Sequence, residues 1–404
     1  MLTSLARSAL TRAQPIISIA ARPSSTRTLW SSLRRSFATE VDQSGDTFHI
    51  RFRDNDFASH KCEPIPLEAT TTKKELVDLF RTMVAIRYLE SACDQAYKSK
   101  LIRGFCHLST GQEAVAAGME AAITKEDAII TAYRCHGFAL TRGQSATAII
   151  AELMGKETGS SKGKGGSMHI FGPEFYGGNG IVGAQVPLGA GVALAQKYMG
   201  LNAMTFSLYG DGAANQGQVF EAYNMAKLWD LPVAFVCENN LYGMGTSAAR
   251  AAASTQYYTR GDYIPGIRVN GRDALAVKAG CTYARDWTLS GKGPIVMEMV
   301  TYRYGGHSMS DPGTTYRTRE EIQNMRSNSD PITGHKQRLE EFGVLSAEEM
   351  KAIEKEIRAE IDQAVKDAKA AREPDVKELY TEIYCKGTEP VRARGCAPDE
   401  VHTY

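Results

Sequence analysis

The apolar residues of the central segment, residues 203–240, follow a strand period, then a helix period, then a strand period again. Met204, Phe206 and Leu208 alternate with smaller or polar residues, which predicts a strand ending at Tyr209. From about Gln216 the apolar positions have helical spacing. They are Val219, Tyr223, Ala226 and Leu228. After Pro232, which ends this helix, the apolar run Val233–Cys237 predicts a second strand. The segment therefore predicts one crossover unit of strand, helix and strand.

Similar patterns on either side extend this unit into a larger α/β domain. A capping box at Thr72-x-x-Glu75 precedes a helical stripe of Leu76, Leu79, Met83 and Ile86. Two further strands are predicted at Ile267–Val269 and Pro294–Met299, with a helix at Ala274–Tyr283 between them. Residues 41–70 show no clear period and are expected to form an extended lead-in. The fold class predicted is α/β, with a mostly parallel sheet flanked by helices.

The chain is expected to divide into three parts. A second capping box, Ser346-x-x-Glu349, begins a helix with an apolar face and a charged face. Its apolar residues are Met350, Ile353, Ile357, Ile361 and Val365. We therefore expect an α/β domain at residues 40–345 and a C-terminal helix and tail at residues 346–404. Residues 1–39 differ from both in composition.

The leader, residues 1–39, holds six arginines and eight serines but no lysine and no acidic residue. This composition is typical of a mitochondrial transit peptide, although a disordered basic tail would have the same composition. Without the leader, 47 − 6 = 41 basic residues face 46 acidic ones, so the formal charge becomes about −5. We expect no nucleic-acid binding, no membrane span and free thiols at the dispersed cysteines. The location expected is the mitochondrial matrix.

Polar side chains follow both strands of the central crossover. Asp211, between two glycines, follows the first strand, and Asn240 follows the second. Because the carboxyl ends of parallel strands lie side by side, these residues are expected to reach one point in space. Carboxylate and amide oxygens suit Mg²⁺, which usually keeps phosphate oxygens among its ligands. The glycine turn and the following helix would admit a diphosphate. The alternative is an ordinary Gly-Asp-Gly turn between a strand and a helix.

The stretches GDGAANQG, FEAYNMA and ENNLYGMGTS occur in this order within the crossover and just after it. They resemble the alpha subunit of the first component of thiamine-diphosphate-dependent 2-oxo acid dehydrogenases, and most closely those that act on pyruvate. The resemblance implies thiamine diphosphate and Mg²⁺ as cofactors. It also implies Asp211, Asn240 and the backbone carbonyl of Tyr242 as metal ligands, with Gly212 and Ala213 beside the diphosphate.

Other motifs of the family assign further residues. In GFCHLSTGQEA the resemblance places His107 at the substrate end of the cofactor, although a lone histidine is often structural. In TAYRCHG it assigns Tyr133 and Arg134 to the diphosphate, whereas the residues alone are equally compatible with a surface pair. It implies that Gly180 and Val182 contact the aminopyrimidine ring.

A glycine- and serine-rich loop at residues 301–321 carries His307. A loop of this composition is mobile unless something holds it. The resemblance implies that this loop closes over the diphosphate and that His307 contacts phosphate. It also implies that His107 and His307 are the catalytic residues. Ser308 matches the position at which a dedicated kinase inactivates members of the family. Ser247 and Thr315 match two secondary phosphorylation positions, and Gly305 stands where many animal relatives have histidine.

A second loop, residues 159–172, combines glycines with Lys162 and Lys164. We expect it to be flexible and its lysines to be solvated rather than to steer a substrate. His169, within it, is expected to be structural rather than a proton carrier.

The function expected from the resemblance is oxidative decarboxylation of pyruvate with transfer of the acetyl group to a lipoyl group. The partners implied are a beta subunit in an α2β2 heterotetramer, the lipoyl domain of the dihydrolipoyl acetyltransferase, and a regulatory kinase and phosphatase. One alternative is a sister enzyme for branched-chain 2-oxo acids, whose motif tends to carry glutamate and serine in place of Asp211 and Asn215. Another is a non-catalytic structural subunit of the same fold. A bare nucleotide-binding module is disfavoured by the absence of a G-x-G-x-x-G or Walker motif after a strand.

Overall fold

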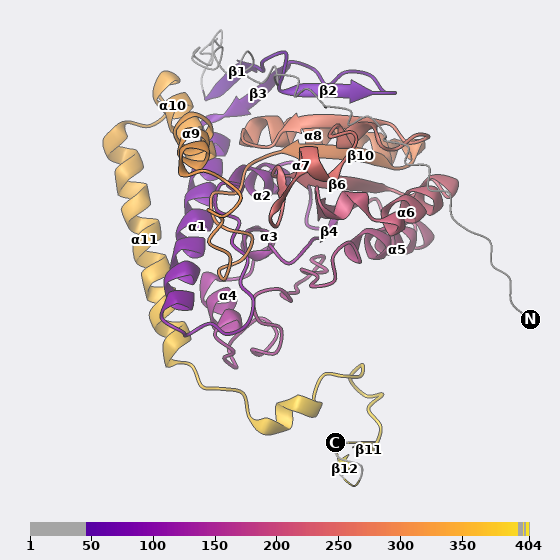
Figure 1. Ribbon diagram of the computed structural model, residues 1–404, viewed down its shortest axis with the longest axis vertical. Helices are drawn as coiled ribbons and strands as arrows, with labels where there is room; N and C mark the ends of the chain where they lie inside the picture. The colour runs from indigo at the N-terminus through magenta and orange to yellow at the C-terminus, as the bar shows by residue number, and fades with distance from the viewer. Residues whose placement is uncertain (1–45, 395–398, 400, 404) are drawn as a thin grey trace, which may run out of the picture. The chain divides into compact units, whose positions relative to one another are not determined.

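The computed structural model describes residues 46–394, 399 and 401–403 of the chain. The leader predicted at residues 1–39 lies outside these residues. Within them the central feature is a six-stranded sheet (Figure 1). Its strand order is β2 (Phe57–His60), β9 (Gly266–Asn270), β10 (Ile295–Val300), β6 (Val233–Asn239), β5 (Thr205–Gly210) and β4 (Ala128–Ile130). Only the β2–β9 pair is antiparallel, so the predicted α/β class with a mostly parallel sheet is confirmed.

Helices cover both faces of this sheet. The α-helices are α1 (Lys73–Lys98), α2 (Glu113–Glu120), α3 (His136–Thr141), α4 (Ala146–Leu153), α5 (Gln185–Tyr198), α6 (Gly217–Leu228), α7 (Ala248–Ala251), α8 (Ala274–Trp287), α9 (Arg319–Ser329), α10 (Pro331–Glu341) and α11 (Ala347–Ala370). Short helical turns lie at η1 (Ala213–Asn215), η2 (Tyr257–Thr259), η3 (Thr288–Lys292) and η4 (Val376–Tyr380). Helices α9 and α10 follow the loop at residues 301–318 and were not predicted from the pattern of apolar residues.

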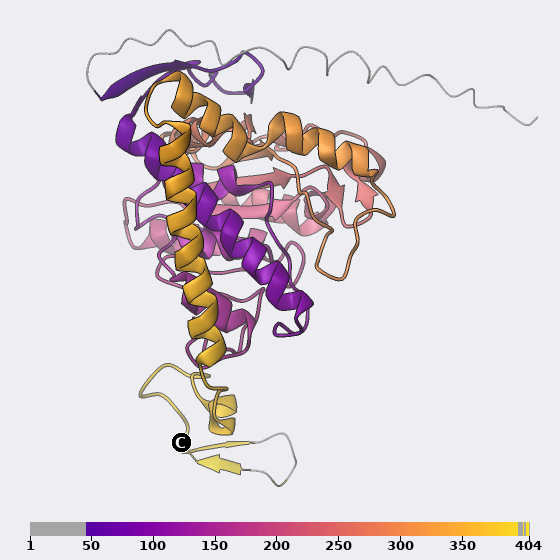
Figure 2. The same ribbon diagram turned by 90° about the vertical axis from the view of Figure 1, so that its left-hand side faces the viewer.

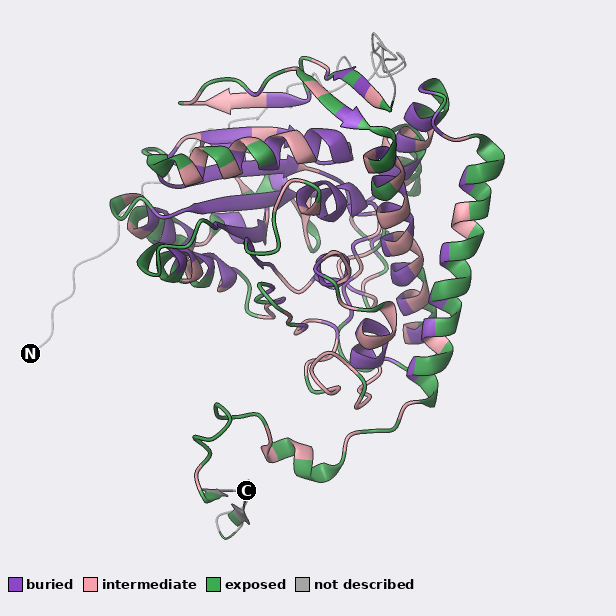
Figure 3. Ribbon diagram, turned by 180° about the vertical axis from the view of Figure 1, so that it is seen from behind, coloured by how far each residue is buried: buried purple, intermediate pink, exposed green. Residues whose placement is uncertain are grey.

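Strand residues alternate between two apolar layers, as the period of two requires. Phe206 and Leu208 of β5 join the larger cluster, which includes residues of α1, α2 and α8. Tyr209 of the same strand joins a smaller cluster with residues of α5 and α6. Figure 3 shows the strands of the sheet as buried along most of their length. The strands between two helical layers are therefore hydrophobic on both faces, which explains the continuous apolar run that predicted β6.

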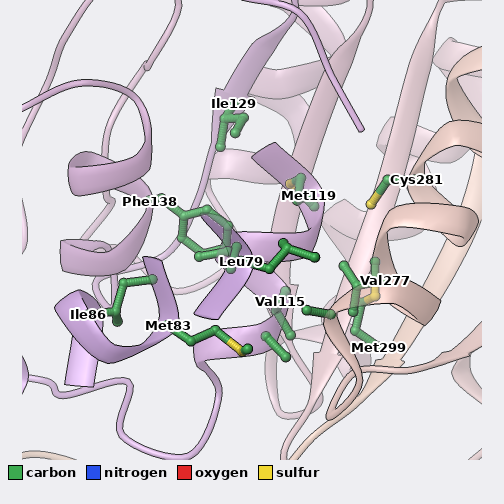
Figure 4. Packing of buried hydrophobic residues seen from close by; sticks show 14 of the residues in the cluster. Leu79, Met83, Ile86, Val115, Met119, Ile129, Phe138, Val277, Cys281 and Met299 are labelled. Carbon is green, nitrogen blue, oxygen red and sulfur yellow. The ribbon is translucent and has the colours of Figure 1, made fainter. Parts of the chain in front are cut away.

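The larger cluster packs α1 and α2 against the sheet and against α8 (Figure 4). Met83 and Ile86 of α1, Val115 and Met119 of α2, and Val277 of α8 are each fully buried. The predicted stripe of α1 is thus packing surface, and truncating any one of these side chains would cost about 2–5 kcal/mol.

Two long helices lie side by side, with α11 against α1 (Figure 2). The Ser346 side chain accepts a hydrogen bond from the Glu349 backbone N–H at 3.2 Å, and the Glu349 side chain accepts from the Ser346 N–H at 2.7 Å. This capping box is confirmed. At Thr72 only the first half forms, because the Glu75 carboxylate accepts from the Thr71 hydroxyl instead, at 2.8 Å.

The lead-in is more ordered than predicted. Strands β1 (Thr47–Arg51) and β3 (Glu68–Thr72) pair with each other, and β2 adds an antiparallel edge to the main sheet. The prediction of a merely extended segment is therefore incomplete, since pairing with β9 cannot be read from local periodicity. Two other pairs are short: β7 (Tyr242–Gly243) with β8 (Thr246–Ser247), and β11 (Arg392–Arg394) with β12 (Val401–Thr403).

The central crossover forms with small shifts of its boundaries. Strand β5 runs one residue further than expected, helix α6 ends four residues before Pro232, and β6 extends through Asn239. The strands β5 and β6 are parallel, with Gly210 opposite Glu238 in the register. The residues after both strands therefore leave the same edge of the sheet. No helix among the described residues is long and apolar enough to cross a membrane.

Candidate functional site

A cavity of about 290 Å³ lies at the carboxyl edge of the sheet, where β5 and β6 end. Segments that are far apart in the sequence line it. The lining residues that our sequence analysis singled out are Tyr133, Arg134, Val182, Asp211, Gly212, Ala213, Asn240, Tyr242 and His307. The cavity thus brings together most of the predicted site residues, from both strand ends and from three loops.

Asp211 and Asn240 occupy neighbouring places on the cavity wall. The backbone N–H of Asn240 lies close enough to the Asp211 carboxyl group to favour its ionised form. The Asn240 amide donates through Nδ2 to Gln112 Oε1 at 3.0 Å. Because Nδ2 is the donor in this bond, Oδ1 is the acceptor atom of the amide. The convergence predicted from the strand order is present.

The loop after β6 is held in an uncommon backbone conformation. Leu241 has a φ of 72°, in the left-handed region that non-glycine residues seldom adopt. Two amide side chains support it, because Asn239 Oδ1 accepts from the Leu241 N–H at 3.1 Å and Asn240 Oδ1 accepts from the Tyr242 N–H at 3.4 Å. The consecutive asparagines therefore shape the turn as well as supplying oxygen atoms.

The two glycines flanking the cavity floor allow their chains to approach each other. A Cβ added to Gly243 would lie 3.2 Å from the Cα of Gly212, closer than an ordinary van der Waals contact. A side chain at either position would push the loop after β5 away from the loop after β6.

Two buried carboxyl groups line the cavity. Burial raises the pKa of Asp211 to about 6, which the Asn240 N–H partly opposes. Burial also raises the pKa of Glu238 to about 7, opposed by the positive charge of Arg134. Among the described residues neither carboxylate forms a direct ion pair, and the more distant charges of Arg303 and Arg134 offset the effect of burial only in part. A divalent ion bound between the strand ends would balance the remaining charge.

Three aromatic rings form a cluster beside the cavity. The His107 ring lies 4.3 Å from the Tyr133 ring and 5.3 Å from the His307 ring, between centroids. Burial and the charge of Arg134 lower the pKa of His107 to about 3 and that of His307 to about 4. Both imidazoles are therefore neutral at physiological pH, and each can donate one hydrogen bond and accept another.

Arg134 ties three segments together from within the protein. Its guanidinium donates to the backbone oxygen of Leu108 and, at 2.9 Å, to that of His307. Burial lowers the pKa of this arginine, yet the side chain stays a cation. A second buried cation, Arg303, also lines the cavity and donates to His307 Nδ1 at 3.4 Å. The site therefore presents positive charge to an anion such as a diphosphate.

The loop at residues 301–318 is held by its own polar side chains. The Asp311 carboxylate accepts from the backbone N–H groups of His307 and Gly313, at 2.6 and 2.8 Å, and from the Tyr316 hydroxyl. Arg317 donates to the backbone oxygen of Arg303 at 2.6 Å. These contacts order a segment whose composition alone predicts mobility.

The three candidate phosphorylation positions differ in exposure. Ser308 is buried, with 7% of its surface exposed, and its hydroxyl lies 2.9 Å from that of Ser310. Ser247, in β8, is half-buried, and Thr315 is exposed. Only Thr315 is therefore accessible without movement of its surroundings.

The glycine-lysine loop, in contrast to our prediction, is fixed around a buried carboxylate. Glu152 of α4 accepts from the backbone N–H groups of Ser161, Gly163, Gly165 and Gly166, at distances from 2.6 to 3.1 Å. The two lysines of this loop are not simply solvated, because both pair with Glu378 and Glu382. His169 lies against Gly165, as a structural residue would.

Two predicted residues lie just outside the cavity wall. Gly180 is two residues before Val182, and a Cβ on it would lie 3.4 Å from the His169 ring. His107 contacts the wall through Tyr133. Four polar or charged lining residues, Gln112, Gln185, Glu238 and Arg303, received no role from the sequence. Glu238 directly precedes the asparagine pair and Arg303 lies four residues before His307, but nothing local distinguishes them from structural residues.

The polar lining can accommodate a bound group. Among the described residues, Gln185 Oε1 in the cavity wall and His107 Nδ1 beside it are buried and have no hydrogen-bond partner. The Asp211 carboxylate and the Gln185 amide are hard oxygen ligands, and the arginine pair beside them can bind an anion. A magnesium–diphosphate unit has the chemistry that this set would bind.

Comparison with known proteins gives consistent matches over most of the chain. The family described as "Dehydrogenase E1 component" matches residues 81–377. The chain is 58% identical, over 91% of its length and 90% of the relative's, to "Pyruvate dehydrogenase E1 component subunit alpha, mitochondrial" of Chaetomium thermophilum. The protein of the same name in Saccharomyces cerevisiae is 57% identical over 90% of the chain and 87% of the relative. A somatic form from Sus scrofa is 55% identical over 89% of the chain and 90% of the relative.

Proposed function

The chain belongs to the dehydrogenase E1 component family, and on that premise we propose that it is the alpha chain of a mitochondrial pyruvate dehydrogenase. The enzyme is an oxidoreductase that decarboxylates pyruvate and transfers the acetyl group to a lipoyl group. The observation that carries the proposal is the meeting of Asp211 and Asn240 on the wall of one cavity.

Thiamine diphosphate, when bound, supplies the nucleophilic carbon and the electron sink that decarboxylation of a 2-oxo acid requires. Mg²⁺ would be held by Asp211, Asn240 and the backbone carbonyl of Tyr242. The buried Asp211 carboxylate supports this assignment, because burial raises its pKa to about 6 despite the charge of Arg303, and a bound cation would relieve the unfavourable burial of its charge. Gly212 and Ala213 would bring backbone close to the diphosphate, where helix η1 begins.

The remaining groups would bind and orient the cofactor. Tyr133, Arg134 and His307 would contact the diphosphate, and their positions on the cavity wall support this role. Gly180 and Val182 would contact the aminopyrimidine ring. Because that ring is planar and carries hydrogen-bonding nitrogens, a backbone that a glycine leaves accessible suits it.

His107 and His307 would act as neutral imidazoles. A neutral ring can accept a proton from one group while it donates to another, which a permanently charged ring cannot do. His107, whose Nδ1 has no hydrogen-bond partner among residues 46–394, would face the substrate end. His307 would link this end with the phosphate end through its contact with Arg303.

The chain would work as one half of a composite site. We assign it a beta subunit as partner in an α2β2 heterotetramer, with the lipoyl domain of the dihydrolipoyl acetyltransferase as acetyl acceptor. Residues 1–39 would direct it to the mitochondrial matrix, leaving residues 40–345 as the diphosphate-binding domain and 346–404 as its C-terminal extension.

Regulation by a kinase and a phosphatase would act on the loop at residues 301–318. Ser308 is the main candidate position, with Ser247 and Thr315 as secondary ones. Since the Ser308 hydroxyl is buried, a kinase would need an open form of the loop, and a phosphate would hinder its return beside the Asp311 carboxylate.

Co-expression with a beta subunit tests the proposal. The purified complex should release CO₂ from pyruvate in a reaction that needs thiamine diphosphate and Mg²⁺, and the single chain should be inactive. Faster turnover of 3-methyl-2-oxobutanoate would identify a branched-chain enzyme instead. Cofactor binding without turnover of either substrate would favour a structural subunit.

A further inference from the structure

A buried carboxylate outside the cavity connects the two segments that carry His107 and Arg134. Glu90 of α1 has no exposed surface. Its Oε1 accepts from both the backbone N–H and the hydroxyl of Ser109, at 3.0 and 2.7 Å. Its Oε2 lies 2.9 Å from Nδ1 of His136. One carboxylate therefore binds both Ser109, two positions after His107, and His136, two positions after Arg134.

The protonation of the pair follows from its contacts. Burial by itself would raise the pKa of Glu90, but His136 and the Ser109 hydrogen bonds lower it, so Glu90 is ionised. An ionised carboxylate only accepts, and Nδ1 of His136 must therefore be the donor. The other ring nitrogen, Nε2, lies 2.9 Å from the Ser167 hydroxyl and 3.2 Å from the Ser167 backbone oxygen.

His136 thereby joins a third segment to the same network. Ser167 belongs to the loop that four backbone N–H groups fix to Glu152. The connection runs from α4 through this loop to His136, and from there through Glu90 to Ser109. Three residues of this connection, Glu90, His136 and Ser167, are buried.

Metal binding does not explain this cluster. Glu90, Cys93 and His136 have ligand atoms within 4.8 Å of one another. However, Nδ1 of His136 is bonded to Glu90 and Nε2 to Ser167, so the ring has no nitrogen left for an ion. Burial also raises the pKa of the Cys93 thiol well above its usual value, which keeps the sulfur protonated.

We propose that Glu90 and His136 are positioning residues for the reaction, with Glu90 setting the place of His107 through Ser109 and His136 setting that of Arg134. Neither touches the cavity that the cofactor would fill. This inference rests on the proposed function, because that function assigns the roles of His107 and Arg134. The hydrogen bonds of Glu90 and His136 are observed independently of it. Small displacements of catalytic groups lower reaction rates strongly. Residues that hold those groups in position through hydrogen bonds are therefore needed for full activity.

Three variants of the assembled alpha–beta enzyme separate the effect on His107 from the effect on Arg134. Ser109→Ala removes only the hydroxyl bond, and we expect kcat to fall about tenfold while cofactor affinity changes less than about twofold. His136→Gln keeps a polar group near the Nε2 position but loses the bond to Glu90, and we expect the Kd for magnesium–thiamine diphosphate to rise about tenfold. His136→Asn keeps a donor near the Nδ1 position and should restore most of that affinity.

Glu90→Gln should produce both effects and should also speed amide hydrogen exchange at residues 104–112 in the cofactor-free complex. This last readout needs no catalysis, so it tests the network even where pyruvate turnover is absent in the parent. The matched control is Asp273→Asn, which breaks a buried ion pair at 2.6 Å between the N-cap residue of α8 and Arg338 of α10, neither of which belongs to the two segments. It should lower thermal stability without changing kcat or cofactor affinity.

The proposal is overturned by either of two results. One is that Ser109→Ala and His136→Gln leave kcat and cofactor affinity at parental values. The other is that kcat and affinity fall together in all variants, the Asp273→Asn control included, in proportion to lost stability. The second result would make Glu90 a structural residue only.

Discussion

Asp211 and Asn240 lie on the wall of one cavity where β5 and β6 end, and the Asn240 backbone N–H favours the ionised form of the Asp211 carboxyl group. Twenty-nine positions separate the two residues along the chain, 240 − 211, and the parallel pairing of their strands removes that separation. This arrangement places a charged oxygen near an amide whose nitrogen is already engaged by Gln112. The two side chains that we propose as Mg²⁺ ligands would therefore be in place before the ion binds.

Replacing Asp211 by asparagine should abolish magnesium-dependent cofactor binding. The amide keeps the size of the side chain but removes the charge that balances the ion, and we expect a loss of affinity on the order of 100-fold. Isothermal calorimetry with thiamine diphosphate and Mg²⁺ measures it. Asp262→Asn, at an exposed position, is the control and should bind as the parent does. Unchanged affinity in the Asp211 variant would show that the ion binds elsewhere.

Replacing Arg134 by lysine should weaken cofactor binding by about 10- to 100-fold, because a compact ammonium group lacks the planar fork of donors that reaches separate acceptors. The substitution would weaken the hydrogen bonds from Arg134 to the backbone oxygens of Leu108 and His307. Calorimetry on the assembled enzyme measures the affinity. Arg142→Lys is the matched control, since Arg142 also binds backbone oxygens from a buried position but does not line the cavity. Equal effects of both substitutions would count against a role at the site.

A glutamate at position 308 should inactivate the enzyme at least about tenfold, because it introduces a charge at a buried position beside the Asp311 carboxylate. Hydrogen exchange at residues 301–318 should become faster at the same time. Ser310→Glu, two residues away at an exposed position, should stay within about twofold of the parent. If the two variants behave alike, burial of Ser308 is not what makes this position sensitive.

Acid sensitivity should decrease when His335 is replaced by glutamine. Burial and the nearby Arg338 lower the pKa of His335 to about 4, whereas the unfolded chain titrates near 6.5. Below pH 6.5 the unfolded state therefore gains protons that the folded state does not, and stability present above that pH is lost as the pH falls. Between pH 7.5 and pH 4.5 the variant should gain about 2.5 kcal/mol relative to the parent.

Unfolding midpoints of the assembled enzyme across this pH range test the prediction. Glutamine can still donate to the backbone oxygen of Leu76, which the Nε2–H group of His335 reaches at 2.8 Å, so the difference at pH 7.5 should be small. His49→Gln, at an exposed position of β1, is the control for the loss of a histidine. A parallel shift of both variants at every pH would contradict the assignment.

The elements that the sequence predicted well are those with a long regular period. Helices α1, α8 and α11 and strands β5, β6, β9 and β10 all lie where apolar spacing placed them. The glycine-lysine loop was predicted as flexible, because the anchoring carboxylate, Glu152, lies outside the loop on α4. Edge strand β2 was missed for a similar reason, since its partner β9 is more than 200 residues away in the chain.

By itself, the sequence determined the order of strand, turn, helix and strand, and with it the acid and amide that end two neighbouring strands. These features depend on periodicity and chain direction, which are local. Only the tertiary structure decided that Arg134 would reach the backbone of His307, 173 residues away, and that Glu90 would hold two loops at once. Contacts of this kind depend on how separate elements pack, and no short pattern of residues encodes that packing.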